Sequence, residues 1–304
     1  MSTLNTTGRI VVGTDGSLAA HSAVDWAARE ASSRGLPLLI ISAVPEHPLP
    51  RRSSLFAALG RDRDYLENLR DKARIKLSDE VRRVQNKYPD LHVEKALVEE
   101  VASYPLARAT KDAALVVVGA RGHSAPLRVK ALGGISDAVV THAHGPVAVI
   151  PEEASQPVGP VVVGVDDAPA AHEAIRVAFT EAARRGVTLV AIFVWHEPAL
   201  AADTALMGSL ALSEVSGEMK EFVEELLAEE AAKYPQVAVD YRVEVGYPAS
   251  VLIDASRSAS LVIVGSRGRG GFAGLMLGST SRAVLRDAHC PVMVVREPKE
   301  RAAG

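Results

Sequence analysis

The chain has 304 residues with a formal net charge of −3 and a pI near 6.3, and 48% of its residues are apolar. This length predicts about two domains, and the absence of a long Lys/Arg run excludes the usual nucleic-acid-binding proteins. One cysteine excludes an intrachain disulfide. Because no apolar stretch reaches membrane-spanning length and the polar N-terminus lacks a signal-peptide core, we expect a soluble cytoplasmic protein without a membrane partner.

The first half alternates short apolar runs with segments of helical periodicity. The runs predict strands at 10–13, 38–44, 92–98, 115–118 and 147–150, with a helix after each of the first four. Continuously apolar runs are typical of strands buried on both faces of a parallel sheet and joined by right-handed crossovers. The proline-rich segment 45–61 predicts a loop over one edge of the sheet, placed where it could act as a lid.

The second half repeats the first. RIVVGTDGS, from Arg9 to Ser17, matches PVVVGVDDA, from Pro160 to Ala168, at an offset of 151 residues, and the run from Leu115 matches the run from Leu261 at an offset of 146. The strands expected here are 161–165, 189–195, 238–245, 261–264 and 292–295, and the helices before the fourth strand are 169–185, one ending near 233, and 248 to about 258. The chain is therefore a duplication of one α/β domain.

The stretch from Leu261 to Ser281 predicts an anion site. An apolar strand ends at Gly265, four more glycines follow within ten residues, and hydroxyl side chains precede a helix. Glycines let the backbone approach a ligand, and the N–H groups of a helix start favour an anion. The glycines alone fit an ordinary surface loop better. The repeat of the pattern from Leu115 to Ser136 favours phosphate.

Two common phosphate motifs are missing, because no G-x4-G-K-[ST] occurs and no G-x-G-x-x-G follows the first strand of either half. The pattern present is Gly265-x2-Gly268-x9-Gly278-Ser279, with Asp166 after the first strand of that half. It resembles the ATP-binding pattern of the universal stress protein family, and 246–249 and 289–292 are further family-like segments. The resemblance covers both halves and is to a tandem member of the nucleotide-binding branch.

This resemblance implies two tandem Rossmann-like (adenine nucleotide alpha hydrolase-like) α/β domains. Each would be a five-stranded parallel sheet of order 3-2-1-4-5 with helices on both faces, so that the loops after strands 1 and 4 face one crevice. The domains would span 1–151 and 160–298, with a linker at 152–159 and a tail at 299–304. The resemblance implies ATP in each crevice, with Mg²⁺ carried by the nucleotide and no separate metal site.

By the same resemblance, the aspartate contacts the adenine end, the first loop glycine the ribose, and the later glycines and hydroxyls the phosphates. Without a ligand the aspartates would cap turns, and Trp195, at the adenine side, fits a core or rim position equally well. The residues implied for the first domain are Gly13, Asp15, Val44, Gly119, Arg121, Gly122, Gly133, Gly134 and Ser136, and those for the second are Gly164, Asp166, Trp195, Gly265, Arg267, Gly268, Gly278, Ser279, Thr280 and Ser281.

The first half departs from the pattern. Ten residues rather than nine precede Gly133, and Gly134 stands where the second half has Ser279, so one hydroxyl is lost. Ser136, aligned with Ser281, is a candidate to compensate in part, and His123 and Lys130 add groups that could reach phosphate. We therefore expect the second half to bind ATP more tightly.

These features favour an ATP-binding stress-response regulatory protein with little or no turnover, because the motif loops supply no general base for water. A slow ATP hydrolase or phosphotransferase and a nucleotide-free interaction scaffold remain as alternatives. His142 and His144 have the spacing of a metal pair but no third ligand nearby, and Cys290 is expected to be a packed core thiol. The strands 147–150 and 292–295 are expected at sheet edges, pairing across pseudo-twofold axes and joining two chains in a homodimer.

Overall fold

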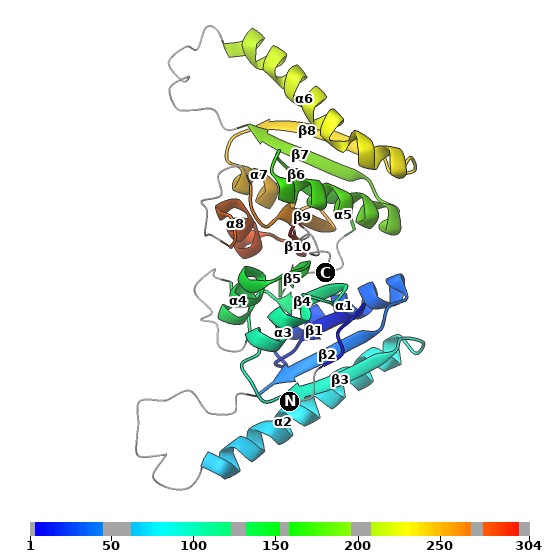
Figure 1. Ribbon diagram of the computed structural model, residues 1–304, viewed down its shortest axis with the longest axis vertical. Helices are drawn as coiled ribbons and strands as arrows, with labels where there is room; N and C mark the ends of the chain where they lie inside the picture. The colour runs from blue at the N-terminus through cyan, green and yellow to red at the C-terminus, as the bar shows by residue number, and fades with distance from the viewer. Residues whose placement is uncertain are drawn as a thin grey trace, which may run out of the picture. The chain divides into compact units, whose positions relative to one another are not determined.

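The computed structural model describes residues 4–44, 62–122, 132–152, 158–195, 208–268 and 276–297, with only the helical backbone at 62–65 and 208–216. The loop predicted at 45–61 lies outside these residues, as do His123 and Lys130. The chain divides into two compact units, Met1–Glu153 and Ala154–Gly304, each an α/β domain (Figure 1). The division falls inside the segment predicted as a linker.

The first unit has the predicted topology. Its strands lie in the order β3-β2-β1-β4-β5, and every neighbouring pair is parallel. The expected order 3-2-1-4-5 is therefore confirmed. The elements of this unit are β1 (Ile10–Gly13), α1 (Leu18–Arg34), β2 (Leu38–Ala43), α2 (Asp62–Lys87), β3 (Val93–Val98), α3 (Ser103–Ala109), β4 (Leu115–Gly119), α4 (Gly134–His142) and β5 (Val147–Ile150).

The second unit repeats this order as β8-β7-β6-β9-β10, again parallel throughout. Within their own units, β5 and β10 are thus the outermost strands, beyond β4 and β9, as predicted. The elements are β6 (Val161–Val165), α5 (Pro169–Arg185), β7 (Leu189–Trp195), α6 (Gly208–Lys233), β8 (Val239–Val245), α7 (Pro248–Ala255), β9 (Leu261–Gly265), α8 (Ser279–Asp287) and β10 (Val292–Val295).

The cores form where the continuous apolar runs predicted them. All four residues of β5 and of β10 are buried, as are the first four of β4 and of β9. In the first unit α1 packs with α2, and α3 with α4, which is the pairing that right-handed crossovers give for this strand order. Helices therefore cover both faces of each sheet, and the loops that leave the carboxyl ends of the strands share one edge (Figure 1).

The helix α7 ends at Ala255, before the predicted end near residue 258, and both α7 and its counterpart α3 end at a side-chain hydroxyl. The Thr110 hydroxyl donates to the carbonyl of Ala107 and accepts the N–H of His144, at 2.6 and 2.8 Å. Ser256 does the same with Ile253 and His289, at 2.5 and 2.9 Å. Each hydroxyl ends its helix and ties that end to the segment leading into β5 or β10, so α3 ends at Ala109 and α7 at Ala255.

Candidate functional site

In both units the aspartate after the first strand lies against the glycine loop after the fourth. The Asp15 Oδ1 atom accepts the N–H of Ser17 at 2.9 Å, and its Oδ2 atom lies 2.7 Å from where a Cβ on Gly122 would stand. Asp166 repeats both contacts, accepting the N–H of Ala168 at 3.1 Å and lying still closer to a Cβ on Gly268. Each aspartate therefore forms the turn and also faces the glycine loop, which only glycine can approach so closely.

Four of the predicted site glycines have a packing role inside their own unit. A Cβ on Gly13 would stand 2.7 Å from Leu106 Cδ1 of α3, and one on Gly164 would stand 2.9 Å from the corresponding Leu252 of α7. Gly119 and Gly265 lie equally close to the first turns of α1 and α5. The small size of these four residues is explained by helix packing alone, so the sequence pattern carries less ligand information at these positions than at Gly122 and Gly268.

The glycine that precedes α4 or α8 is hydrogen-bonded to the residue that follows the fourth strand of its unit. The N–H of Gly133 donates to the carbonyl of Ala120, and that of Gly278 to the carbonyl of Ser266, both at 2.8 Å. Neither glycine has a side chain that could cap the helix that follows. The first N–H groups of α4 and α8 therefore point toward the same edge of the sheet as Asp15 and Asp166, where an anion would be stabilised.

The hydroxyls of Ser136 and Ser281 bind backbone carbonyl groups within their own units. Each serine is 5% exposed, and each hydroxyl donates at 2.6 Å to a carbonyl at the strand end, Gly119 for Ser136 and Gly265 for Ser281. Since both units use this bond alike, Ser136 does not replace the hydroxyl that the first unit lacks. Ser279 is exposed at the first position of α8 and remains the side chain that distinguishes the second helix start from Gly134.

The remaining predicted residues lie around this edge. Val44 is buried after β2, whereas Trp195 is half-buried at the end of β7 and pairs with Val245 of β8. Arg121 is half-buried and Arg267 exposed. The structure thus brings together the loops that the sequence singled out, and it leaves more aromatic surface in the second unit than in the first.

Arg296 is a residue near this edge that the sequence analysis missed. It directly follows β10, and the preceding carbonyl, of Val295, accepts the N–H of Ser266 at 2.7 Å. Burial, and then the positive charge of Arg267, lower the pKa of Arg296. The first unit has the same backbone bond, from Ala120 to Ile150, but Pro151 follows. Among the described residues, the second unit thus has Arg296 in addition to Arg267, whereas the first unit has Arg121 alone at the corresponding positions.

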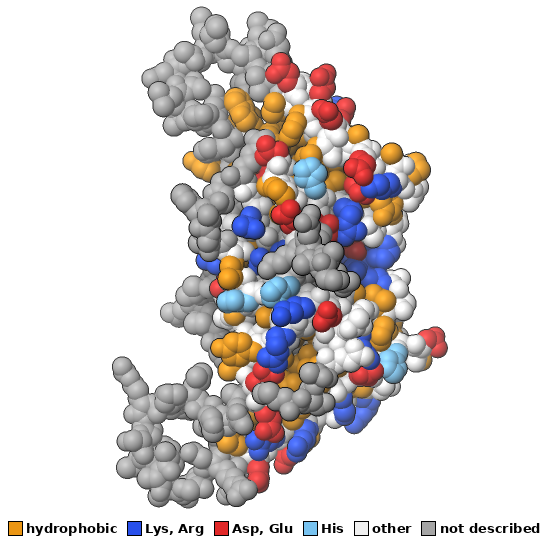
Figure 2. All heavy atoms as spheres, in the orientation of Figure 1, with side chains coloured by type: hydrophobic (Ala, Val, Ile, Leu, Met, Phe, Trp, Pro, Cys, Tyr) orange, Lys and Arg blue, Asp and Glu red, His pale blue; other side chains and the backbone are white. Residues whose placement is uncertain are grey.

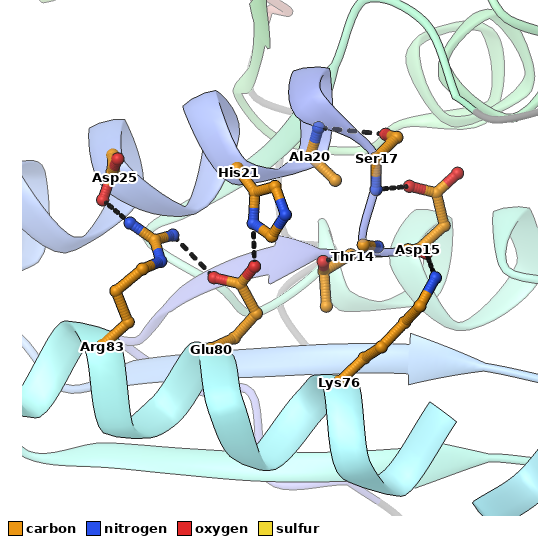
Figure 3. Close-up of polar contacts among 10 residues, drawn as sticks. Thr14, Asp15, Ser17, Ala20, His21, Asp25, Lys76, Glu80 and Arg83 are labelled. Carbon is orange, nitrogen blue, oxygen red and sulfur yellow. Dashed lines mark hydrogen bonds and ion pairs between the residues drawn. The ribbon is translucent and has the colours of Figure 1, made fainter. Parts of the chain in front are cut away.

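A charged cluster between α1 and α2 was also missed. Glu80 of α2 is 2% exposed, and its carboxylate contacts His21 of α1 and Arg83, the latter at 2.6 Å. Arg83 also contacts Asp25 of α1 (Figure 3). The sequence did not predict this cluster, because charged residues along a long amphipathic helix are typical of its solvent-exposed face. We refer to His21, Asp25, Glu80 and Arg83 as the α1–α2 ion cluster.

The other candidates from the sequence are simpler. Cys290 is buried, as predicted, and burial raises the pKa of its thiol to about 12. The Nδ1 atom of His142 lies 2.9 Å from the carbonyl of Ala138 in its own helix, and His144 is exposed. Among the described residues no group of three or more His, Cys, Asp or Glu side chains is arranged to hold a metal ion.

The described helices include none that is both long and apolar enough to cross a membrane. On the face drawn in Figure 2, acidic and basic side chains are interspersed without a region of one sign, in keeping with the net charge of −3. The surface thus agrees with the composition.

Comparison with known proteins gives one consistent result. The profile of the universal stress protein family matches residues 6–151 and again residues 157–296. Universal stress protein Rv1996 of Mycobacterium tuberculosis is 35% identical over 322 residues, covering 99% of each chain, and universal stress protein Rv2623 of the same organism is 36% identical over 308 residues, covering 98% of this chain and 99% of the other. A crystal structure of a universal stress protein from Archaeoglobus fulgidus shares the fold, with a TM-score of 0.62 and 17% identity over 97% of this chain and all of the other. The chain belongs to the universal stress protein family and is a tandem member with two family domains.

Proposed function

We propose that this chain is an ATP-binding regulatory protein of the stress response, with one nucleotide site in each unit and little or no turnover. The observation that best supports the proposal is the contact of Asp15 with Gly122, repeated as the contact of Asp166 with Gly268. In both units this contact lies where the loops after the first and fourth strands meet, which is where open α/β sheets bind ligands.

The residues at this edge fit a nucleotide. The N–H groups that begin α4 and α8 suit phosphate oxygens, and Arg121 and Arg267 stand at matching positions. Ser279 and Thr280 add hydroxyl donors in the second unit, where the first has Gly134 and Ile135. The aspartates would contact the adenine end, beside Val44 in one unit and Trp195 in the other. Mg²⁺ would bind mainly to the phosphates and water and would neutralise part of the phosphate charge.

The same residues favour binding over hydrolysis. A general base must lie within hydrogen-bonding reach of the attacking water and must be able to accept its proton. In each unit one oxygen of the site aspartate already accepts a backbone N–H, and both aspartates are proposed to lie at the adenine end. Signalling through nucleotide occupancy is therefore the mechanism that these residues support best.

Two measurements test the proposal. Mass spectrometry of the small molecules released on denaturing the purified protein should detect adenine nucleotide, and calorimetric titration of nucleotide-free protein should rank ATP above GTP, CTP and UTP. The matched control is the double variant Gly122→Val and Gly268→Val, which should neither carry nor bind nucleotide while keeping the circular dichroism of the parent. A parent chain that binds no nucleotide, or a double variant that binds as well as the parent, would contradict the proposal.

We also propose that the chain forms homodimers through its outermost strands. The support is that β5 and β10 each lie beyond the fourth strand of their own unit, beside β4 and β9, and are wholly apolar. Light scattering across a wide concentration range should give the mass of two chains. A single-chain mass at every concentration contradicts this proposal.

A further inference from the structure

A lysine from α2 reaches the turn that carries Asp15. The Nζ atom of Lys76 donates to the carbonyl oxygen of Asp15 at 3.4 Å (Figure 3). The aliphatic stem of Lys76 lies over Gly16, where a Cβ would stand 2.8 Å from its Cδ atom. Gly16 has a φ of 72°, so this position favours glycine for its backbone conformation, and the Lys76 side chain lies against it.

The α1–α2 ion cluster explains why Lys76 stands there. Glu80 lies one helical turn after Lys76 on α2, and its two carboxylate oxygens contact His21 of α1 and Arg83 of its own helix. Arg83 extends the link to Asp25, one turn further along α1. A buried carboxylate held from both helices resists sliding of one helix along the other, because a shift would leave its charge without partners.

Lys76 acts on the turn from the side opposite the glycine loop. The carboxylate of Asp15 faces Ser17 and Gly122, whereas its carbonyl faces Lys76 (Figure 3). The lysine therefore bonds the backbone of the residue whose side chain forms the proposed site. A positive charge next to this turn also offsets part of the negative charge that Asp15 presents to an anionic ligand.

The second unit lacks the lysine and the buried glutamate at the matching positions, although His172 of α5 matches His21 of α1. Both α2 and α6 have 26 residues and end in lysine, which aligns Lys76 with Phe222 and Glu80 with Leu226. Phe222 packs edge-on against Phe193 of β7 with ring centroids 5.9 Å apart, and Asp167 stands in place of Gly16. The position that matches Lys76 is thus occupied by an aromatic side chain that packs on β7.

We propose that Lys76 is a positioning residue of the first nucleotide site, which makes α2 part of that site alone. The effect on affinity rests on the proposed function, because Lys76 acts through Asp15 on the nucleotide that the site is proposed to bind. The effect on the order of the turn does not depend on a ligand. The proposal adds that the first site depends on how α2 sits against α1. In the described part of α6, Phe222 stands at the position of Lys76.

The first experiment needs no ligand. Hydrogen exchange of the backbone amides at Gly16 and Ser17 is compared in the full-length parent and in Lys76→Met, Lys76→Arg and Lys72→Met. Lys72 is exposed one turn earlier on α2 and serves as the control for loss of charge. We expect exchange at both amides to accelerate at least about threefold in Lys76→Met, to return to the parent rate in Lys76→Arg, and to stay unchanged in Lys72→Met. Unchanged exchange in Lys76→Met overturns the proposal.

The second experiment measures ATP affinity of the first site in chains whose second site carries Gly268→Val. Loss of one charge-assisted hydrogen bond near the surface predicts about threefold to tenfold weaker binding in Lys76→Met, with recovery in Lys76→Arg. In an Asp15→Ala background the same lysine change should have no further effect, since Lys76 acts through Asp15. Equal losses in both backgrounds would overturn the positioning role. A parent that binds no ATP while exchange responds as expected would overturn the proposed function and leave the contact itself intact.

Discussion

The two units share one fold and differ in how the helices on one face of the sheet are held together. In the first unit α1 and α2 meet through a buried carboxylate, with Glu80 contacting His21 and Arg83. In the second unit, Phe179 of α5 stacks on Tyr234, the residue after α6, with ring centroids 6.0 Å apart, and the Tyr234 hydroxyl lies 3.1 Å from that of Thr180. The two units thus join this pair of helices through different side chains while keeping the same strand order.

The units also differ in how their helices begin. The Ser17 hydroxyl accepts the N–H of Ala20 at 3.2 Å, so α1 has a side-chain cap, whereas α5 begins after Ala168 with Pro169 in its first turn. Toward the phosphate end the order reverses, since α4 begins with Gly134 and α8 with Ser279. The first unit thus has a capping hydroxyl next to its aspartate, and the second has a hydroxyl at the start of the helix after its fourth strand. This difference predicts that the two proposed sites bind ATP with unequal affinity.

The largest expected effect comes from filling the space beside one aspartate. Gly268→Val places a β-branched side chain against the Asp166 carboxylate and should weaken ATP binding in the second site by about 100-fold or more. Gly122→Val should do the same in the first site, so titrating the two variants gives each site separately. Gly217→Ala on α6, where a Cβ meets nothing within 4 Å, is the control and should leave both affinities unchanged. Unchanged binding in Gly268→Val would show that the proposed site lies elsewhere.

A second effect concerns stability and should be confined to the first unit. Glu80→Gln removes the charge that contacts His21 and Arg83, and because these partners are partly exposed we expect a loss of about 1–3 kcal/mol in the free energy of unfolding. Glu229→Gln, which breaks an exposed pair with Lys233 on α6, should leave the free energy of unfolding nearly unchanged.

Labelling of Cys290, which lies in the second unit, can show whether the loss of stability in Glu80→Gln is confined to the first unit. The buried thiol of this cysteine, with a pKa raised to about 12, should resist alkylation at pH 8 until the second unit unfolds. Urea titrations followed by Cys290 labelling should therefore have the same midpoint in the parent and in Glu80→Gln, while circular dichroism shows an earlier first transition in the variant. An equal shift of both probes would mean that the two units unfold together.

The third effect sharpens the difference between the two helix starts. Gly134→Ser gives α4 the hydroxyl that Ser279 gives α8, and one hydrogen bond to a charged phosphate predicts up to about tenfold tighter ATP binding in the first site. Calorimetry in a Gly268→Val background measures that site alone. Ala138→Ser, one turn further into α4, is the control and should not strengthen binding. A first site that already binds ATP more tightly than the second would contradict the predicted ranking.

The sequence was sufficient for the fold because its signals were redundant. Continuous apolar runs marked the strands, glycines such as Gly35 and Gly186 marked the helix ends, and the internal repeat gave both halves the same succession of strands and helices. The contacts inside the candidate site could not be predicted as well from the sequence, because one residue type can serve several structural roles. Gly13 makes room for Leu106, and Ser136 bonds the carbonyl of Gly119, although both belong to a ligand pattern. Glu80 and Arg296 were missed because burial of a charged residue depends on partners distant in sequence.

The smallest expected effect tests whether the charge near the second helix start matters. Pro151→Arg places an arginine after β5 at the position that Arg296 holds after β10, next to the same backbone bond from the loop. Removal of the proline also restores a backbone N–H, so Pro151→Gln is the matched control without charge. A single added charge near a solvated phosphate predicts about twofold to threefold tighter ATP binding in the first site, declining as salt rises. Adenosine, which has no phosphate, should bind equally well to the parent, to Pro151→Arg and to Pro151→Gln. A gain for adenosine as large as that for ATP would show that the substitution reshapes the loop rather than adding attraction for phosphate.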